Sequence, residues 1–299
     1  MTLDIEADAA LPPAWFTEAL AAPVTEHAAS LDGVRVAYRM WGGPAERGIV
    51  LVHGGGAHSR WWDHIAPLLA AERRVIAMDL SGHGDSGRRA NYNFDTWARE
   101  VLAVAADAGL DTPPVVIGHS MGGVVALRLA AMSGAQIEGV VIVDSPLRDP
   151  APEEQAAQRQ RVFRQLRVYP TREAILARFR PVPDQPVLGY IADHVAAMSI
   201  REVDGGWTWK WDPAVFSSRE TPPGPLTKLD CRAALFRAEH GILSAEMSDL
   251  IYDRLGRVAP VIEIPVAGHH VMLDQPIALV AALRTLLSDW DHSRPEPRP

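Results

Sequence analysis

The residues best suited to chemistry stand in the stretch Gly118-His119-Ser120-Met121-Gly122. An apolar run, Val115 to Ile117, predicts a strand before it, and a helical pattern follows it. A serine at the apex of a sharp turn from strand to helix holds its hydroxyl clear of the backbone, beside a helix N-terminus that favours developing negative charge. The glycines on either side suit so tight a turn, and Gly123 would let the helix pack closely on the sheet. Ser120 is therefore a candidate nucleophile.

The elements that must position Ser120 alternate between buried strands and helices. Continuous apolar strands separated by helices predict a mostly parallel sheet covered on both faces, and therefore an α/β fold. Earlier in the chain, Leu31-Asp32-Gly33 is expected to be the turn of an antiparallel hairpin at one edge of the sheet. The buried strands are expected at residues 48–53, 74–79, 115–117, 139–144, 233–237 and 258–264, with helices at residues 64–71 and 94–109.

Residues 146–225 break this alternation. Helical stretches are expected at residues 153–168, 171–179 and 190–198, between proline-rich joints and without a buried strand. Such an excursion predicts an inserted helical cap over the carboxyl edge of the sheet, where parallel sheets bind ligands. The remaining chain then divides into an N-terminal lead-in (residues 1–24), a core (25–145 and 226–290) and a disordered tail (291–299).

With this turn and this order of elements, the chain resembles the α/β-hydrolase fold family, which has a mostly parallel, eight-stranded sheet. The stretch Asp79-Leu80-Ser81-Gly82-His83-Gly84-Asp85-Ser86 resembles the D-x-x-G-x-G-x-S turn of that family and is expected to be structural. The resemblance implies a general base on the loop after the last strand. There the chain reads Ala267-Gly268-His269-His270, followed by Asp274 and Pro276 as in the family, so His269 is the expected base and His270 its competitor.

The acid that orients the base has two candidates. Most members of the family place it on the loop after the penultimate strand, but the expected position here is Gly241, and Glu239 is the nearby carboxylate. Haloalkane dehalogenases and the hydrolases of the lactone zearalenone carry the acid at the end of the strand that follows the nucleophile. In this chain that position is Asp144, which is the first choice, with Glu239 as the alternative.

An oxyanion hole requires two backbone N–H groups that meet the negative oxygen of the tetrahedral intermediate. One donor is expected to be Met121, the residue after the nucleophile. The other is expected on the loop His53-Gly54-Gly55-Gly56, and the family's His-Gly-x pattern implies that Gly55 is the donor. His53 is expected to hydrogen-bond within the loop.

A serine in this turn implies attack on an acyl carbon and a covalent acyl-enzyme. The leading hypothesis is a serine esterase or lactonase, with Ser120 as nucleophile, His269 as base and Asp144 as acid. The alternatives are a carbon–carbon bond hydrolase that acts on vinylogous diketones, a cofactor-free perhydrolase, and a ligand receptor built on this fold.

Aromatic residues are the candidates for the substrate pocket. In the stretch Trp207-Thr208-Trp209-Lys210-Trp211, an extended backbone places three indoles on one side, suited to an apolar or aromatic substrate. These rings could equally anchor the cap to the core, and the same choice applies to Trp61. Met198 is a further pocket candidate.

Composition limits the other classes of function. A net charge of −8 gives no electrostatic footprint for nucleic acid or an anionic membrane. One cysteine allows no intrachain disulfide, the first residues form no secretory signal, and the histidines show no metal-ligand spacing. We therefore expect a cytoplasmic monomer or homodimer that acts on a small molecule without a cofactor or metal.

Overall fold

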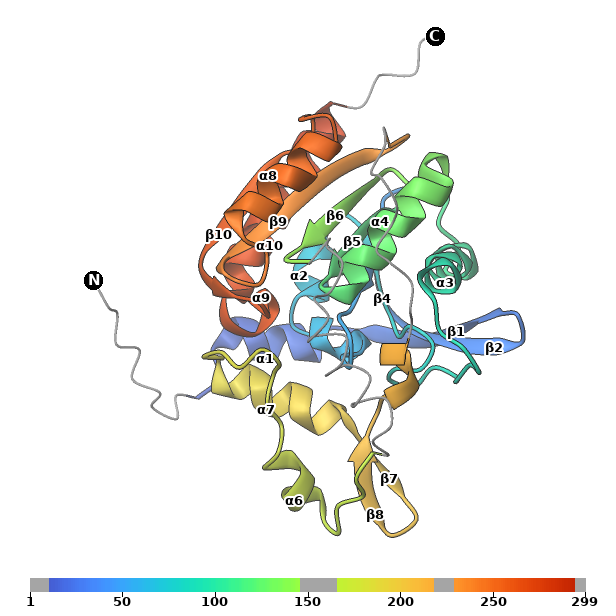
Figure 1. The fold of residues 1–299 in the computed structure, drawn as a ribbon, viewed down its shortest axis with the longest axis vertical. Coiled ribbons are helices and arrows are strands. Elements are labelled where there is room, and N and C mark those ends of the chain that lie inside the picture. The colour runs from blue at the N-terminus through green and yellow to red at the C-terminus, as the bar shows by residue number, and fades with distance from the viewer. Residues whose placement is uncertain (1–10, 146–165, 218–228, 294–299) are drawn as a thin grey trace.

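The computed structural model describes residues 11–145, 166–217 and 229–293 (Figure 1). Its centre is an eight-stranded sheet with the order β1-β2-β4-β3-β5-β6-β9-β10. The strands after β2 pair in parallel, and β1 and β2 form an antiparallel edge. The predicted mostly parallel sheet is confirmed. Its strands are β1 (Val24–Leu31), β2 (Val34–Trp41), β3 (Gly48–Val52), β4 (Arg74–Met78), β5 (Val115–His119), β6 (Gly139–Val143), β9 (Arg232–His240) and β10 (Val261–Gly268).

The hairpin at the edge turns where the sequence predicts it. Asp32 and Gly33 both have positive φ angles, 52° and 77°, which is the combination required by a two-residue turn whose twist matches that of the strands. This turn sets β1 against β2 over their whole length, with Leu31 opposite Val34. The sheet therefore starts at an antiparallel edge and becomes parallel beyond β4.

Helices cover both faces of the sheet because the strand side chains alternate between the two faces. Ile49 and Leu51 of β3 pack in a cluster with α2 and α10, whereas Val50 and Val52 pack on the other face with α3 and α4. The strands of the centre are buried from end to end, as a sheet covered on both faces requires. The helices of these layers are α2 (Ala66–Leu69), α3 (Phe94–Asp107), α4 (Met121–Ser133), α8 (Ala245–Arg254), α9 (Val271–Asp274) and α10 (Pro276–His292), with short 3-10 turns η1 (Ser59–Trp62) and η2 (Gly134–Gln136).

The described part of the predicted cap contains more than helices. Besides α6 (Arg172–Leu176) and α7 (Gly189–Met198) it holds a hairpin of β7 (Ile200–Val203) and β8 (Gly206–Trp209), and the 3-10 turn η3 (Pro213–Ser217) (Figure 1). The hairpin was not predicted. The chain leaving it pairs with the Asp79–Ser86 turn, because the Gly84 N–H donates to the Lys210 carbonyl at 2.7 Å and the Asp212 N–H to that of Gly82 at 2.8 Å.

Most of the helix predicted at residues 153–168 lies outside the described residues. The prediction is wrong at its end, where residues 166–168 are irregular and lead to Tyr169. The Tyr169 N–H donates to the Trp207 carbonyl at 2.8 Å, and the reverse hydrogen bond has the same length. An extended backbone at Tyr169 is therefore required by its pairing with the hairpin.

The two ends of the described chain also differ from the prediction. The predicted lead-in contains a helix, α1 (Ala14–Ala21), whose Phe16 is buried against Tyr190 of α7. Helix α10 runs to His292, into the predicted tail, and its Asp291 accepts a hydrogen bond from Arg73 at 2.6 Å. None of the described helices is long and apolar enough to cross a membrane.

The approach of α4 to the sheet yields a stability prediction. A Cβ added to Gly123 would overlap the Ser145 hydroxyl and lie 2.9 Å from the Ser145 Cβ. We expect Gly123→Ala to lower the free energy of unfolding by about 1–3 kcal/mol, measured by urea denaturation. Gly189→Ala is the matched control, because nothing lies within 4 Å of its added Cβ. Equal stability of the two variants would contradict the packing described here.

Candidate active site

Ser120 lies in the strained turn between β5 and α4. Its φ of 53° is unusual for a residue with a side chain, and its N–H is held by the Val143 carbonyl at 3.0 Å. A Cβ on Gly118 would overlap the Gly122 carbonyl oxygen, and one on Gly122 would overlap the carbonyl oxygens of β3 and of the residue after it. Only glycine fits at both positions, and the Ser120 side chain stays partly exposed.

Three side chains far apart in the sequence meet at this turn. The Nε2 of His269 lies 3.1 Å from the Ser120 Oγ, and its Nδ1 lies 2.7 Å from an oxygen of Asp144. A neutral imidazole that donates its Nδ1–H to the carboxylate leaves Nε2 free to accept the serine proton. His269 and Asp144 are buried, so this hydrogen-bonded chain reaches solvent through Ser120. The arrangement is chemically able to turn a hydroxyl into a nucleophile.

Asp144 follows β6 in a left-handed conformation, with φ at 41°. Its side chain is completely buried, and burying a carboxylate is costly unless hydrogen bonds replace its water. Besides His269, three backbone N–H groups supply those bonds: Ala238 at 3.3 Å, Ile242 at 2.9 Å and Leu243 at 3.4 Å. The end of β9 and the loop after it therefore fold around this carboxylate.

The position of Asp144 explains why residue 241 is a glycine. A Cβ on Gly241 would overlap both carboxylate oxygens of Asp144, so no side chain at that position is compatible with this arrangement. Glu239, the alternative acid, is exposed and accepts a hydrogen bond from the Val266 N–H at 2.7 Å. Of the two predicted acids, the structure brings Asp144 to His269 and places Glu239 at a bulge in β10 instead.

Two further histidines flank His269. The His119 Nε2 lies 2.8 Å from the His269 carbonyl, and the His270 Nε2 lies 3.1 Å from the Val182 carbonyl. Burial lowers the pKa of His270 to about 3 and the pKa of His119 well below its usual range. Both rings are therefore neutral at pH 7 and place no positive charge beside His269. Between the two competing histidines, it is His269 that contacts Ser120.

One nitrogen from each of the three imidazoles lies within 4.8 Å of the others, close enough to approach a metal ion. In the arrangement described, however, both nitrogens of His269 already serve Asp144 and Ser120. A metal bound to His269 would have to replace one of these hydrogen bonds. The geometry therefore favours proton transfer over metal coordination at this ring.

The glycine loop after β3 lies beside Ser120. A Cβ added to Gly54 would be 3.2 Å from the Ser120 Cβ, and one added to Gly55 would be 3.6 Å from the Met121 Sδ. In the described part of the chain, neither the Gly55 N–H nor the Met121 N–H donates a hydrogen bond. The His53 Nδ1 lies 2.7 Å from the Gly54 carbonyl oxygen, and this contact restrains the loop. These two N–H groups thus have no hydrogen-bond partner among the described residues.

The predicted pocket tryptophans have different surroundings. Trp61 is buried with its ring 5.4 Å from that of His270, and Phe179 continues the row from Trp61 to Trp209, with 6.3 Å between ring centres at each step. These rings connect the cap to the histidine loop. Phe179 carried no signal in the sequence, because it is a single aromatic residue within an expected helix.

A second aromatic pair lies at the glycine loop. Trp211 packs edge to face against Phe216 at 5.4 Å, and a Cβ added to Gly55 would lie 3.0 Å from the Phe216 ring. Phe216, also missed from the sequence, therefore sits against the glycine loop. Trp207 and Met198 are partly buried, and among the described residues the Trp207 ring makes no contact with another aromatic ring.

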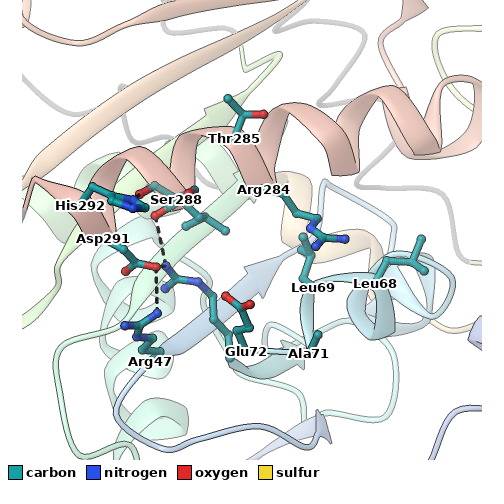
Figure 2. A pocket seen from close by; sticks show the side chains of 12 residues that line it. Arg47, Leu68, Leu69, Ala71, Glu72, Arg284, Thr285, Ser288, Asp291 and His292 are labelled. Atoms are coloured by element: carbon teal, nitrogen blue, oxygen red, sulfur yellow. Dashed lines mark hydrogen bonds and ion pairs between the residues drawn. The ribbon is translucent and has the colours of Figure 1, made fainter.

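Two surface hollows lie away from Ser120, at the amino ends of the strands. One, between the start of β4 and α10, surrounds Asp291, which accepts hydrogen bonds from Arg47 at 3.2 Å and Arg73 at 2.6 Å (Figure 2). The other lies beside Glu138 and Arg232, before β6 and β9. Ser120 is at the carboxyl edge of the sheet, where ligands bind in parallel sheets, so neither hollow belongs to this site.

The parallel sheet and the serine turn define an α/β-hydrolase, and comparison with known proteins agrees. Residues 49–283 match the model of the Alpha/beta hydrolase family, and the chain belongs to this family. It is 29% identical over 256 residues to esterase Rv0045c of Mycobacterium tuberculosis. This alignment covers 83% of this chain and 84% of the esterase. Several other curated relatives share shorter stretches, and the chain spans 28–41% of their lengths.

Solved structures show the same fold. A structure of the Mycobacterium tuberculosis esterase Rv0045c has a TM-score of 0.72 at 23% identity, and the match covers 92% of this chain and 98% of that chain. E-2-(Acetamidomethylene)succinate hydrolase has a TM-score of 0.76 at 20% identity, covering 89% of this chain and all of its own. A thioesterase domain from the curacin biosynthetic pathway has a TM-score of 0.72 at 22% identity, covering 88% and 99%.

The carboxylate after His269 yields a pH prediction. One oxygen of Asp274 accepts from the Gly268 N–H at 2.6 Å, and burial raises the pKa of Asp274 from 3.8 to about 6. Between these values the folded state holds a proton that the unfolded state has lost, so stability falls as the pH rises. Asp274→Asn keeps an acceptor oxygen without the charge. We expect the free energy of unfolding of Asp274→Asn, relative to that of the parent, to increase as the pH rises from 4 to 7.

Urea denaturation at pH 4, 5, 6, 7 and 8 checks this expectation. Asp249→Asn is the control, because Asp249 is exposed on α8 and its substitution should give a difference that does not follow this pH window. If the difference in free energy of unfolding between Asp274→Asn and the parent does not change with pH, the raised pKa of Asp274 is contradicted.

Proposed function

We propose that the chain is a serine hydrolase that cleaves a carboxylic ester or a lactone through an acyl-enzyme. Its assignment to the ester-acting hydrolases rests on the family match and on the esterase relative. The finer proposal is carried by one observation, the hydrogen-bonded chain from Ser120 through His269 to Asp144, with 3.1 Å and 2.7 Å between the paired atoms. We assign these residues the roles of nucleophile, base and acid.

In acylation, the Ser120 Oγ attacks the acyl carbon while its proton moves to the His269 Nε2. Asp144 keeps the imidazole in the required tautomer and stabilises its positive charge. The N–H groups of Gly55 and Met121 meet the oxygen that becomes negative, and each such donor typically lowers the barrier by about 2.7–4 kcal/mol. The imidazolium then protonates the leaving alcohol, which departs and leaves the acyl group on Ser120.

Deacylation repeats these steps with water. His269 takes a proton from a water molecule, the hydroxide adds to the acyl carbon, and the Ser120 oxygen leaves with the proton from the imidazolium. In a lactone the leaving hydroxyl remains part of the acid product. Every proton is handled by His269, so the proposed reaction requires neither a metal nor a cofactor.

The surroundings of Ser120 support a small apolar or aromatic substrate. Phe216 lies against the glycine loop, and Trp61 lies against His270, the residue after His269. Aromatic rings favour apolar and ring-bearing groups. The position of the acid after β6, shared with lactone hydrolases of this fold, supports including lactones among the substrates.

The proposal is tested by Ser120→Ala on an aryl acetate and on an aryl lactone such as dihydrocoumarin. Removing the nucleophile should lower kcat by at least about 1000-fold while folding is kept, since the other groups cannot form the acyl-enzyme. Ser288→Ala, which removes an exposed hydroxyl on α10, should leave kcat unchanged. Turnover by folded Ser120→Ala equal to that of the parent would exclude the mechanism.

A further inference from the structure

The segment 182–188 of the predicted cap lies on the loop that carries His269. The Val182 carbonyl lies 3.1 Å from the Nε2 of His270, and the Leu188 N–H donates to the Leu273 carbonyl at 2.9 Å. Between these two points the side chain of Gln185 reaches the same loop. The contacts join positions more than 80 residues apart in the sequence, so the cap segment and the loop are fixed to each other only by the fold.

Gln185 uses both ends of its amide on this loop. Its Nε2–H donates to the Asp274 carboxylate at 2.8 Å, and its oxygen accepts from the His270 N–H at 2.8 Å. The amide lies on the backbone of Gly268, where an added Cβ would be 2.8 Å from the Gln185 amide carbon. The Gly268 N–H donates to the same Asp274 oxygen at 2.6 Å. One side chain thus holds the residues immediately before and after His269.

The loop needs this support because the chain leading into it is strained. Val266 has a φ of 58°, which is unfavourable for a β-branched residue, and it interrupts the register of β10 two residues before Gly268. His119 holds the loop from the opposite side through the His269 carbonyl. Small displacements of a catalytic group are costly, since an error of about 1 Å can reduce the rate about 100-fold.

We propose that Gln185 is a positioning residue for His269, through which the cap segment 182–188 sets the geometry of the base. This role rests on the proposed function, because it matters only if His269 transfers protons. Gln185 acts on the rate and not on substrate affinity, since its amide contacts the histidine loop. The seating of the cap and the turnover number are therefore coupled.

Two substitutions separate this role from a structural one. Gln185→Ala removes both hydrogen bonds. Gln185→Glu keeps an oxygen for the His270 N–H but sets a second carboxylate against Asp274, and two carboxylates this close cannot both be ionised. A shared proton would restore the bridge at low pH. The other titratable groups that face this pair are Asp144, His269 and His270, and burial keeps the pKa of His270, at about 3, below the range tested.

The experiment measures kcat and KM on an aryl ester from pH 6 to pH 8 for the full chain. We expect Gln185→Ala to lower kcat about 10- to 100-fold with KM within about twofold of the parent. We expect the kcat of Gln185→Glu, taken as a ratio to the parent, to rise as the pH falls from 8 to 6. Asp184→Ala, the exposed neighbour, should match the parent.

A kcat of Gln185→Ala within twofold of the parent, a loss confined to KM, or a Gln185→Glu ratio that does not change with pH would overturn the proposal. Circular dichroism and melting temperature establish that each variant is folded, and if Gln185→Ala does not fold, the pH dependence of Gln185→Glu decides. Unchanged activity in Ser120→Ala would remove the proposed function itself. A parent that depends on Ser120 together with an unaffected Gln185→Ala would remove only the positioning role.

Discussion

A completely buried carboxylate must have every lost contact with water replaced, and the structure around Asp144 follows from this constraint. Three N–H groups from the end of β9 and its following loop converge on it, and the remaining partner is His269. The loop can approach so closely only because residue 241 has no side chain. The carboxylate therefore fixes the loop after β9 and, through its own hydrogen bond to Nδ1, the orientation in which the His269 ring meets Ser120.

Unfavourable backbone conformations occur at the positions that aim these side chains. Ser120, Asp144 and Val266 all have positive φ angles although none is glycine. Each is held by a specific hydrogen bond of its N–H: to the Val143 carbonyl, to the Phe236 carbonyl and to the Glu239 carboxylate. Such strain persists only where the surroundings enforce it. The rigid parallel sheet supplies that enforcement at the ends of β5 and β6, and Glu239 supplies it at the bulge of β10.

The parts of the site that depend on neighbouring residues could be predicted from the sequence. The turn around Ser120 and the loop around His269 have local patterns, and the strands before them are continuous apolar runs. The resemblance ranked Asp144 above Glu239 but left both open, since both lie at the carboxyl ends of neighbouring strands and only the path of the later loop separates them. The glycine at position 241 favours Asp144 as the acid, because a residue without a side chain there leaves space for the Asp144 carboxylate from the neighbouring strand.

Long-range contacts could not be predicted. Gln185, Phe179 and Phe216 have no local pattern that marks them, and their partners are set by how the cap folds back on the core. The hairpin of β7 and β8 did leave a local signal, the pair Asp204-Gly205 that forms its two-residue turn before the alternating tryptophans, and Gly205 has a positive φ of 85°. The sequence predicted an extended backbone at residues 207–211 but not the strand that pairs with it.

Kinetics of Asp144→Asn beside Glu239→Gln on a chromogenic aryl ester test the assignment of the acid most directly. Both substitutions remove one negative charge and almost no volume, and both residues end strands at the same edge of the sheet. If Asp144 orients His269, Asp144→Asn should lower kcat by about 1000- to 10,000-fold, because the amide favours the wrong tautomer, while Glu239→Gln stays within about tenfold of the parent. A collapse of kcat in Glu239→Gln with Asp144→Asn nearly unaffected would contradict the assignment.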